Sequence, residues 1–193
     1  MINARVVLRP VTQADLELFE AEFSGPEGTG VHQWFGYRSP VDLRRRFAET
    51  GLLTPDGGTL TVCEEGGDVA GRVEWFKSSW GRPETSWCWT VAIGLRPSRQ
   101  GRGIGTEAQR LLVAYLFDHT RAQRIQAFTD SGNLAEQRAL EKAGFEREGV
   151  LRQAQWRAGH WHDQILYSTL RPTTVGDEGR GADKPGERPA RSG

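Results

Sequence analysis

The sequence predicts a mixed α/β fold, on three grounds. Segments whose large apolar side chains alternate with small ones, as in a strand, are interspersed with segments of helical periodicity. The strongest strand, at 85–95, leads through a glycine-rich loop directly into a helix. The 193 residues suffice for one domain that buries its own core.

The first half of the chain predicts one strand, two helices and three further strands joined by short turns. Thr12 and Asp15 have the residue types of a helix start, a capping hydroxyl and an acid in the first turn. Ser39 and Pro40 mark the start of the second helix in the same way. The expected elements are a strand at 4–9, helices from 12 and 39, and strands at 59–64, 69–77 and 85–95.

The second half predicts a helix, a strand, a further helix and a long hairpin, followed by a tail. The hairpin turns at Ala158 and Gly159. Glycine, proline and mixed charges dominate residues 173–193, so we expect a disordered tail after a domain of residues 1–172. The expected elements are a helix after 104, a strand at 124–129, a helix at 133–143 and hairpin strands at 145–157 and 160–170.

The loop between the strongest strand and the following helix has the composition of an anion-binding site. Gly101, Gly103 and Gly105 carry no side chain, so backbone N–H groups at the helix start can approach a ligand closely. The helix dipole favours negative charge there, which suits a pyrophosphate. Thr106 and Glu107 exclude a P-loop, which has Lys and then Ser or Thr, and Thr106 also excludes the dinucleotide fingerprint, which has glycine.

Two signatures resemble those of the GCN5-related N-acetyltransferase (GNAT) superfamily. Gln100-x-x-Gly103-x-Gly105 resembles its acyl-coenzyme A loop. Asn133, Arg138 and the run Glu141-Lys142-x-Gly144-Phe145 resemble the segment that closes a helix and opens a strand in that superfamily. Two further segments, Leu8-Arg9-Pro10 near the start and Gly149-x-Leu151-Arg152 near the end, resemble the branch of the superfamily named for RimJ and RimL. The resemblance covers about residues 4 to 171.

The resemblance implies a GNAT fold, an activity and a cofactor. The fold is a mostly antiparallel central sheet flanked by helices, whose fourth and fifth strands splay around the acyl-CoA site. The activity is N-acyl transfer from acetyl-CoA or another acyl-CoA to an amine. The residues implied to bind the donor are Leu95, Gln100, Gly101, Arg102, Gly103, Ile104, Gly105, Thr106 and Asn133.

The group that protonates the departing thiolate is less evident, because two hydroxyls usual in the family are replaced. Leu140 stands where many members have Tyr, and Glu136 stands where the RimL-like pattern has Ser. Glu136 can act as a general acid if burial raises its pKa well above about 4.3. Alternatively, Glu136 and Asn133 form only a capping box. Ser131 and Tyr167 are weaker candidates.

A general base is also not evident. The second acid of the RimL-like pattern falls on Gln155, which cannot accept a proton at neutral pH. Glu74 is the best remaining carboxylate to face a cleft, although an exposed strand face also explains it. His160, His162 and Asp163 lie close enough in sequence to suggest a metal, but a polar hairpin face explains them better, and we expect no metal.

Composition indicates a cytoplasmic protein without a nucleic-acid or membrane partner. The 25 basic residues equal the 25 acidic ones, and the N-terminus lacks the apolar run of a signal peptide. Cys63 and Cys88 both lie in expected strands, which indicates buried reduced thiols. Seven tryptophans exceed what a core needs, so we expect some to line an aromatic acceptor groove.

The leading functional hypothesis is an N-acyltransferase, most simply of acetyl groups, that acts on a peptide N-terminus or a small metabolite. One alternative takes the acyl group from the pantetheine thioester of an acyl carrier protein. Another is a GNAT homologue that binds CoA or a ligand without catalysis. Because no strong base is evident, we expect α-amines to react faster than lysine side chains or polyamines.

Overall fold

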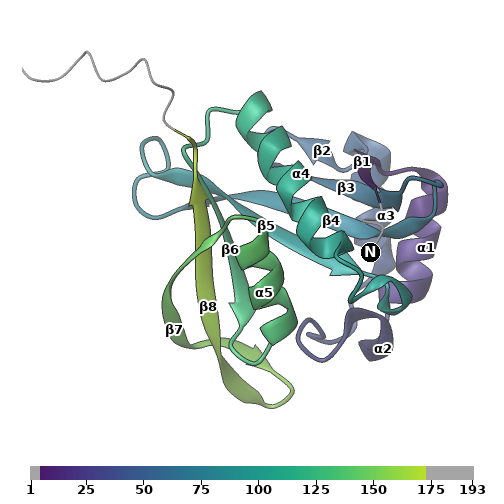
Figure 1. Ribbon diagram of the computed structural model, residues 1–193. Helices are drawn as coiled ribbons and strands as arrows, with labels where there is room; N and C mark the ends of the chain where they lie inside the picture. Colours follow the sequence, from purple (N-terminus) through teal and green to yellow (C-terminus); the bar gives the residue numbers. More distant parts are fainter. Residues whose placement is uncertain (1–4, 173–193) are drawn as a thin grey trace, which may run out of the picture.

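The computed structural model describes residues 5–172 as one mixed sheet with five helices (Figure 1). The predicted disordered tail at 173–193 lies outside the described residues, as does the exact extent of the domain at its ends. The strands are β1 Val6–Pro10, β2 Leu53–Thr54, β3 Gly57–Glu64, β4 Val69–Ser79, β5 Trp87–Leu95, β6 Arg124–Asp130, β7 Glu146–Arg157 and β8 His160–Leu170. The helices are α1 Gln13–Phe23, α2 Pro26–Thr29, α3 Pro40–Thr50, α4 Ile104–His119 and α5 Leu134–Lys142.

The strands follow the order β1-β3-β4-β5-β6-β8-β7 across the sheet, and β2 pairs with β3. Every neighbouring pair is antiparallel except β5 and β6, which run parallel. The helix α4 crosses the front of the sheet, and α5 lies on the same side, in front of β6 and β8 (Figure 1). The expected mixed, mostly antiparallel sheet is therefore confirmed.

The helix starts that the sequence predicts form by the expected contacts. Thr12 caps α1, and Thr12 and Asp15 form a reciprocal capping box. The Ser39 hydroxyl accepts the N–H of Val41 at the start of α3. The sequence analysis missed α2 and β2, because elements of four and two residues are too short to show a periodicity.

The main core lies between α4 and the sheet. Ile104, Ala108, Leu112 and Leu116 recur along one face of α4, and all are almost fully buried against the strands. The two cysteines, Cys63 and Cys88, are both free and buried, as predicted. Burial raises the pKa of both thiols.

The strands β5 and β6 separate soon after they begin to pair. Trp89, Thr90 and Val91 pair with Ile125, Gln126 and Ala127, and the ladder of the described sheet ends there. Beyond Val91, β5 continues to Leu95 while still paired with β4 on its other side. The divergence is the splay that the family resemblance implies, and it opens the centre of the sheet.

No helix in the described part of the chain is both long and apolar enough to cross a membrane.

Candidate active site

Two adjoining cavities lie at the split between β5 and β6. The first, of about 370 Å³, lies beside the loop at 100–106 and the start of α5, and we call it the loop cavity. The second, of about 500 Å³, lies among β4, β5, β6 and residues 32–38, and we call it the strand cavity. Eight residues line both: Phe23, Thr29, His32, Gln33, Ile93, Gly94, Asn133 and Glu136.

The loop cavity has the features of an anion site at the start of α4. Gly101 and Gly103 have positive φ values of 72° and 81°, and open space lies where their side chains would be. Gly103 is the N-cap of α4, and within the described chain no side chain caps this helix. Its first-turn N–H groups therefore remain for a ligand. Arg138 and Lys142 of α5 line the same cavity and add positive charge.

Most of the residues implied to bind the donor come together here. Those that line the loop cavity are Leu95, Gln100, Gly101, Gly103, Gly105, Thr106 and Asn133. The side chains of the other two lie elsewhere. Arg102 donates from Nη2 to Oε2 of Glu64 at 2.8 Å, and Ile104 is 1% exposed in the core. Only the backbone of Arg102 and Ile104 is left to contribute at the loop.

Two glutamine side chains cover the edge of β5 that faces the split. Gln100 donates from Nε2 to the carbonyl oxygen of Leu95 at 3.1 Å, which ties the loop to the strand end. Gln33 donates from Nε2 to the carbonyl oxygen of Ile93 at 3.0 Å, from a loop 60 residues away in sequence. The edge of β5 thus contacts both the loop at 100–106 and the segment around residue 33.

Glu136 lies where the two cavities meet. Burial raises its pKa from 4.5 to about 7, and the Gln109 amide, which is close to the carboxyl without meeting hydrogen-bond geometry, offsets part of this effect. The Asn133 Oδ1 accepts the Glu136 N–H at 3.2 Å, but the Asn133 N–H donates to the carbonyl of Asp130 at 2.9 Å. Only half of the expected capping box is therefore present among the described contacts, and capping does not account for the Glu136 carboxyl.

Gln109 is an unusual neighbour for this carboxyl. Its side chain extends from α4 into the wall of the strand cavity and is 3% exposed. Neither its amide oxygen nor its amide nitrogen has a hydrogen-bond partner within the described chain. A buried unpaired amide is costly, and such groups are typically found where a ligand or water binds.

The other predicted carboxylate and its neighbours line only the strand cavity. Glu74 faces this cavity from β4, with its Oε1 2.6 Å from Nε of Arg72. Gln155, at the position of the RimL-like acid, accepts a hydrogen bond from Gln164 at 2.8 Å. The ion pair with Arg72 therefore already occupies one oxygen of the Glu74 carboxylate.

The remaining sequence candidates are divided between the cavity and the rest of the fold. Trp34 lines the strand cavity, as expected for an aromatic groove, whereas Trp156 and Trp161 are each 55% exposed elsewhere. Tyr167 is fully buried and donates its hydroxyl to Glu141 at 3.0 Å. Ser131 lines neither cavity. Within residues 5–172, no three His, Cys, Asp or Glu side chains are grouped to hold a metal ion.

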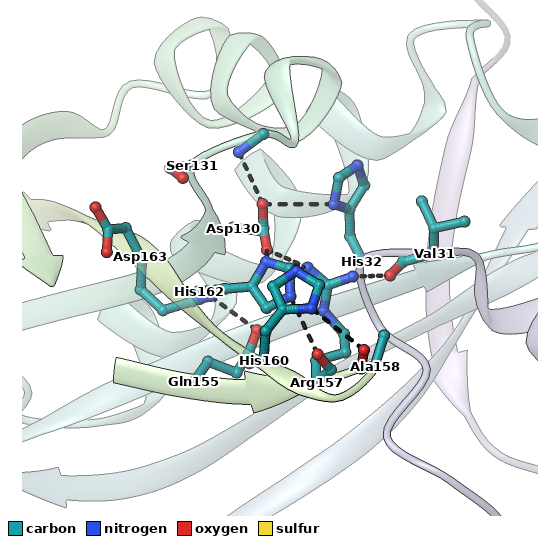
Figure 2. A network of polar contacts seen from close by, with 12 residues as sticks. Val31, His32, Asp130, Ser131, Gln155, Arg157, Ala158, His160, His162 and Asp163 are labelled. Atoms are coloured by element: carbon teal, nitrogen blue, oxygen red, sulfur yellow. Dashed lines mark hydrogen bonds and ion pairs between the residues drawn. The ribbon is translucent and has the colours of Figure 1, made fainter. Parts of the chain in front are cut away.

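A buried ion pair joins the cavity wall to the hairpin of β7 and β8 (Figure 2). Arg157 of β7 donates to Asp130 at the end of β6 and to the carbonyl of Val31, and the two side chains of the ion pair are about 5% exposed. Burial alone would raise the pKa of Asp130, but the Gly132 N–H at 2.7 Å and the Arg157 charge outweigh it and lower the pKa.

Two histidines flank the same carboxylate. The Nδ1 atom of His32 is 3.6 Å from Asp130 Oδ1, and the Nδ1 atom of His162 is 3.3 Å from Asp130 Oδ2. The two rings lie on different sides of Asp130 (Figure 2). His32 lines both cavities, whereas His162 lines neither.

A family comparison identifies the class of protein to which this fold and site belong. The model of the acetyltransferase (GNAT) domain matches residues 5–146. The chain belongs to this family and is a GNAT-family N-acyltransferase, of the class that transfers acyl groups from acyl-CoA to amines.

Curated relatives carry acetyltransferase names. The chain is 43% identical over 161 residues to the aminoglycoside N(6')-acetyltransferase type 1 of Klebsiella pneumoniae, and the match covers 77% of this chain and 78% of that protein. It is 36% identical over 115 residues to the Bacillus subtilis protein named "Probable N-acetyltransferase YjcK". That match covers 60% of this chain and 61% of the YjcK protein, less than two thirds of its length.

Solved structures share the fold at low sequence identity. The spermidine N-acetyltransferase of Vibrio cholerae, in complex with CoA and spermine, matches with a TM-score of 0.72 and 19% identity, over 86% of this chain and 95% of that one. RimL, the ribosomal L7/L12 alpha-N-protein acetyltransferase, in complex with CoA, matches with a TM-score of 0.71 and 16% identity, over 86% and 93%. The RimJ/RimL-like architecture is therefore confirmed.

Among the residues that the structure brings to the cavities, the sequence analysis did not assign His32, Gln33 or Gln109 to the site, and it named Arg138 and Lys142 only as parts of a family signature. Arg138 and Lys142 are four residues apart, so a helix places them on one face, and this spacing was a usable signal. The other three come from a loop and a helix far apart in the chain, with no local pattern that would bring them together.

Proposed function

We propose that this protein transfers an acetyl group from acetyl-CoA to the amine of a small metabolite or of a peptide N-terminus. The observation that carries the proposal is the position of Glu136, a carboxyl with a pKa of about 7 where the two cavities meet. A group that is partly protonated near neutral pH at this point is suited to give a proton to a leaving thiolate.

The loop cavity supplies the donor site in this proposal. The N–H groups at the start of α4, with Arg138 and Lys142, are suited to hold phosphate groups. The edge of β5 beyond Val91 is no longer paired with β6, so an extended chain of amides can pair with it once the Gln33 and Gln100 side chains release the carbonyls of Ile93 and Leu95. Acetyl-CoA would supply the activated acyl group, and no step in the proposal uses a metal ion.

The strand cavity supplies the acceptor site. Its volume of about 500 Å³ is in the range typical of small-molecule pockets. The aromatic rings of Trp34 and Phe76 form part of its wall, and Glu74 adds a carboxylate that attracts an ammonium group. We assign Glu74 the binding and orientation of the acceptor.

The amine that this site suits best is a weakly basic one. Deprotonation of a lysine-type ammonium near pH 7.4 costs about 4 kcal/mol, whereas an α-ammonium costs under about 1 kcal/mol. Two carboxylates of the strand cavity, Glu74 and Asp130, are each held in an ion pair by an arginine, Arg72 and Arg157. The site therefore favours α-amino peptides or weakly basic amine metabolites over lysine side chains and polyamines.

A panel of acceptors incubated with acetyl-CoA tests the proposal, with released thiol and product mass as the readouts. The panel includes α-amino peptides, amino acids, an aminoglycoside, spermidine and a peptide whose only free amine is on lysine. We expect α-amines to be acetylated at least tenfold faster than the lysine peptide and spermidine.

Three other results of the acceptor panel would contradict parts of the proposal. Preferential acetylation of spermidine or lysine contradicts the argument from amine pKa. Turnover only with an acylated carrier protein makes that protein the donor in place of acetyl-CoA. CoA binding without turnover of any acceptor or donor contradicts catalysis.

A further inference from the structure

We infer that His32 is the general base of this enzyme, oriented by Asp130 and acting opposite Glu136. The inference rests on the proposed function. Of the eight residues that line both cavities, only His32 and Glu136 have side chains that ionise. Acyl transfer to an ammonium group uses one proton acceptor and one proton donor near the reacting atoms, and these are the two groups available there.

The surroundings of His32 determine which ring nitrogen faces the cavities. Its Nδ1 atom is buried and directed at Asp130 Oδ1, 3.6 Å away, while the side chain as a whole is 33% exposed. Within the described chain Nδ1 makes no hydrogen bond, and the Asp130 carboxylate is the ionic group that it faces. Catalytic hydrogen bonds are often longer before substrate binds. We therefore assign the ring proton to Nδ1, toward Asp130, which leaves the Nε2 lone pair for the cavities that His32 lines.

The packing around His32 is specific. A Cβ atom at position 132 would lie 3.1 Å from Asp130 Oδ1, a tight contact, and 3.6 Å from Cε1 of His32, an ordinary one, so Gly132 leaves room for the carboxylate beside the ring. Arg157 connects the carboxylate to the backbone next to the histidine, because it donates both to Asp130 and to the carbonyl of Val31, the neighbour of His32. The histidine and the carboxylate are thus held together from three elements of the fold.

Four charged or titratable groups surround the imidazole. Asp130 of β6 faces the ring at Nδ1, and Arg157 of β7 pairs with the same carboxylate. His162 of β8 lies beyond Asp130, and Glu136 of α5 shares both cavities. The imidazole thus has one carboxylate on one side and, across the cavities, the carboxyl that the proposal uses as the acid.

The proton balance assigns each residue one task. The acceptor enters as R–NH3+ and leaves as an amide, so it loses two protons. Nε2 of His32 takes the proton whose loss frees the nitrogen lone pair, and this pair forms the N–C bond at the thioester carbonyl. The C–S bond breaks with its electrons on sulfur, which Glu136 protonates. The second nitrogen proton restores the Glu136 carboxyl, and His32 releases its proton to solvent.

The substitution His32→Gln tests the role, because glutamine keeps a hydrogen-bond donor for Asp130 but cannot shuttle a proton at neutral pH. We expect kcat/KM to fall at least tenfold for the best acceptor, with the acidic limb of the pH profile displaced to higher pH. The dissociation constant for acetyl-CoA and the melting temperature should change little. The matched control is His162→Gln. His162 also lies beside Asp130 but lines neither cavity, so this variant should keep kcat/KM within about twofold of the unsubstituted protein.

An NMR measurement of the His32 tautomer adds a readout that is independent of turnover. We expect the Nδ1–H form at pH 8, and the Nε2–H form would overturn the inference. Equal losses in both glutamine variants, or an unchanged rate and pH profile in His32→Gln, would also overturn it and leave the proposed function intact. No acylation by the unsubstituted protein would overturn the proposed function, and the role of His32 with it.

Discussion

The burial that raises the pKa of Glu136, and so suits it to protonate the leaving thiolate, also makes its ionised form lower the stability of the folded protein. Its pKa is about 7 in the folded protein against an ordinary 4.5. Between these values the folded state keeps a proton that the unfolded chain has lost, so the free energy of unfolding falls as pH rises through this window. Above pH 7 the loss is complete and reaches up to about 3 kcal/mol.

The substitution Glu136→Gln should therefore separate stability from activity. At pH 8 we expect the melting temperature to rise by several degrees, because a neutral amide replaces a buried carboxylate. At pH 5, near the lower end of the window, most of this difference should be gone. Turnover should fall at least tenfold, because the proton for the thiolate is removed. Thermal unfolding at both pH values and steady-state kinetics give the measurement.

Glu146→Gln is the control for this prediction, since Glu146 is exposed at the start of β7 and lines neither cavity. It should change neither the melting temperature at pH 8 nor the rate. Normal turnover by Glu136→Gln would show that Glu136 is not the acid.

At the scale of elements, the start of α4 depends on a backbone conformation that few residues adopt. Gly103 has a φ of 81° and faces open space in the loop cavity. Asparagine tolerates this conformation better than other residues with side chains, so Gly103→Asn keeps the turn while it fills the space. We expect the dissociation constant for CoA to rise at least tenfold, measured by calorimetry.

Gly51→Asn is the matched control for the loop. Gly51 has a φ of 62°, ends α3 and also meets open space, but it lines neither cavity. Both variants should lose a similar, small amount of thermal stability, and only Gly103→Asn should lose CoA. Tight CoA binding by Gly103→Asn would exclude this loop as the phosphate site.

The sequence predicts the helices and strands well and the site only in part, because the site depends on contacts between residues far apart in the chain. Strand alternation and helix caps are local patterns, so the bounds of β8 and the start of α1 follow from neighbouring residues. The Gly103 loop and Glu136 are also visible locally. The raised pKa of Glu136 depends on burial by distant segments, and the approach of His32 to Asp130 spans about a hundred residues of chain. Neither has a signature in sequence spacing.

For the whole molecule, the two cavities and the contacts of Arg171 bear on the predicted domain of residues 1–172. Every residue that lines the two cavities lies between Phe23 and Gln164. After β8, Arg171 donates to three carbonyls around the end of α4: Phe117 at 2.7 Å, Thr120 at 2.5 Å and Ala122 at 3.0 Å. This arginine therefore satisfies backbone groups that the helix end leaves unpaired.

A chain that ends at Pro172 should accordingly keep the melting temperature, CoA affinity and turnover of the full chain. A chain that ends at Leu170 is the matched comparison, because it differs by the loss of Arg171 and Pro172. We expect it to be less stable by about 1 to 3 kcal/mol, from the loss of hydrogen bonds to a charged donor. Circular dichroism melting of both chains provides the measurement. Equal stability of the two would contradict the role of Arg171, and inactivity of the longer would place the domain boundary beyond 172.

The short ladder between β5 and β6 has a consequence for how the molecule responds to its ligands. Three residue pairs join the part of the sheet that contains β1, β3, β4 and β5 to the part that contains β6, β8 and β7. The two parts are thus coupled weakly where they meet and firmly within themselves. In the function proposed above, the donor would pair with β5 in the split, in place of the Gln33 and Gln100 side chains, and would join the two parts as an added strand does. Binding of the donor would then also make the sheet more rigid.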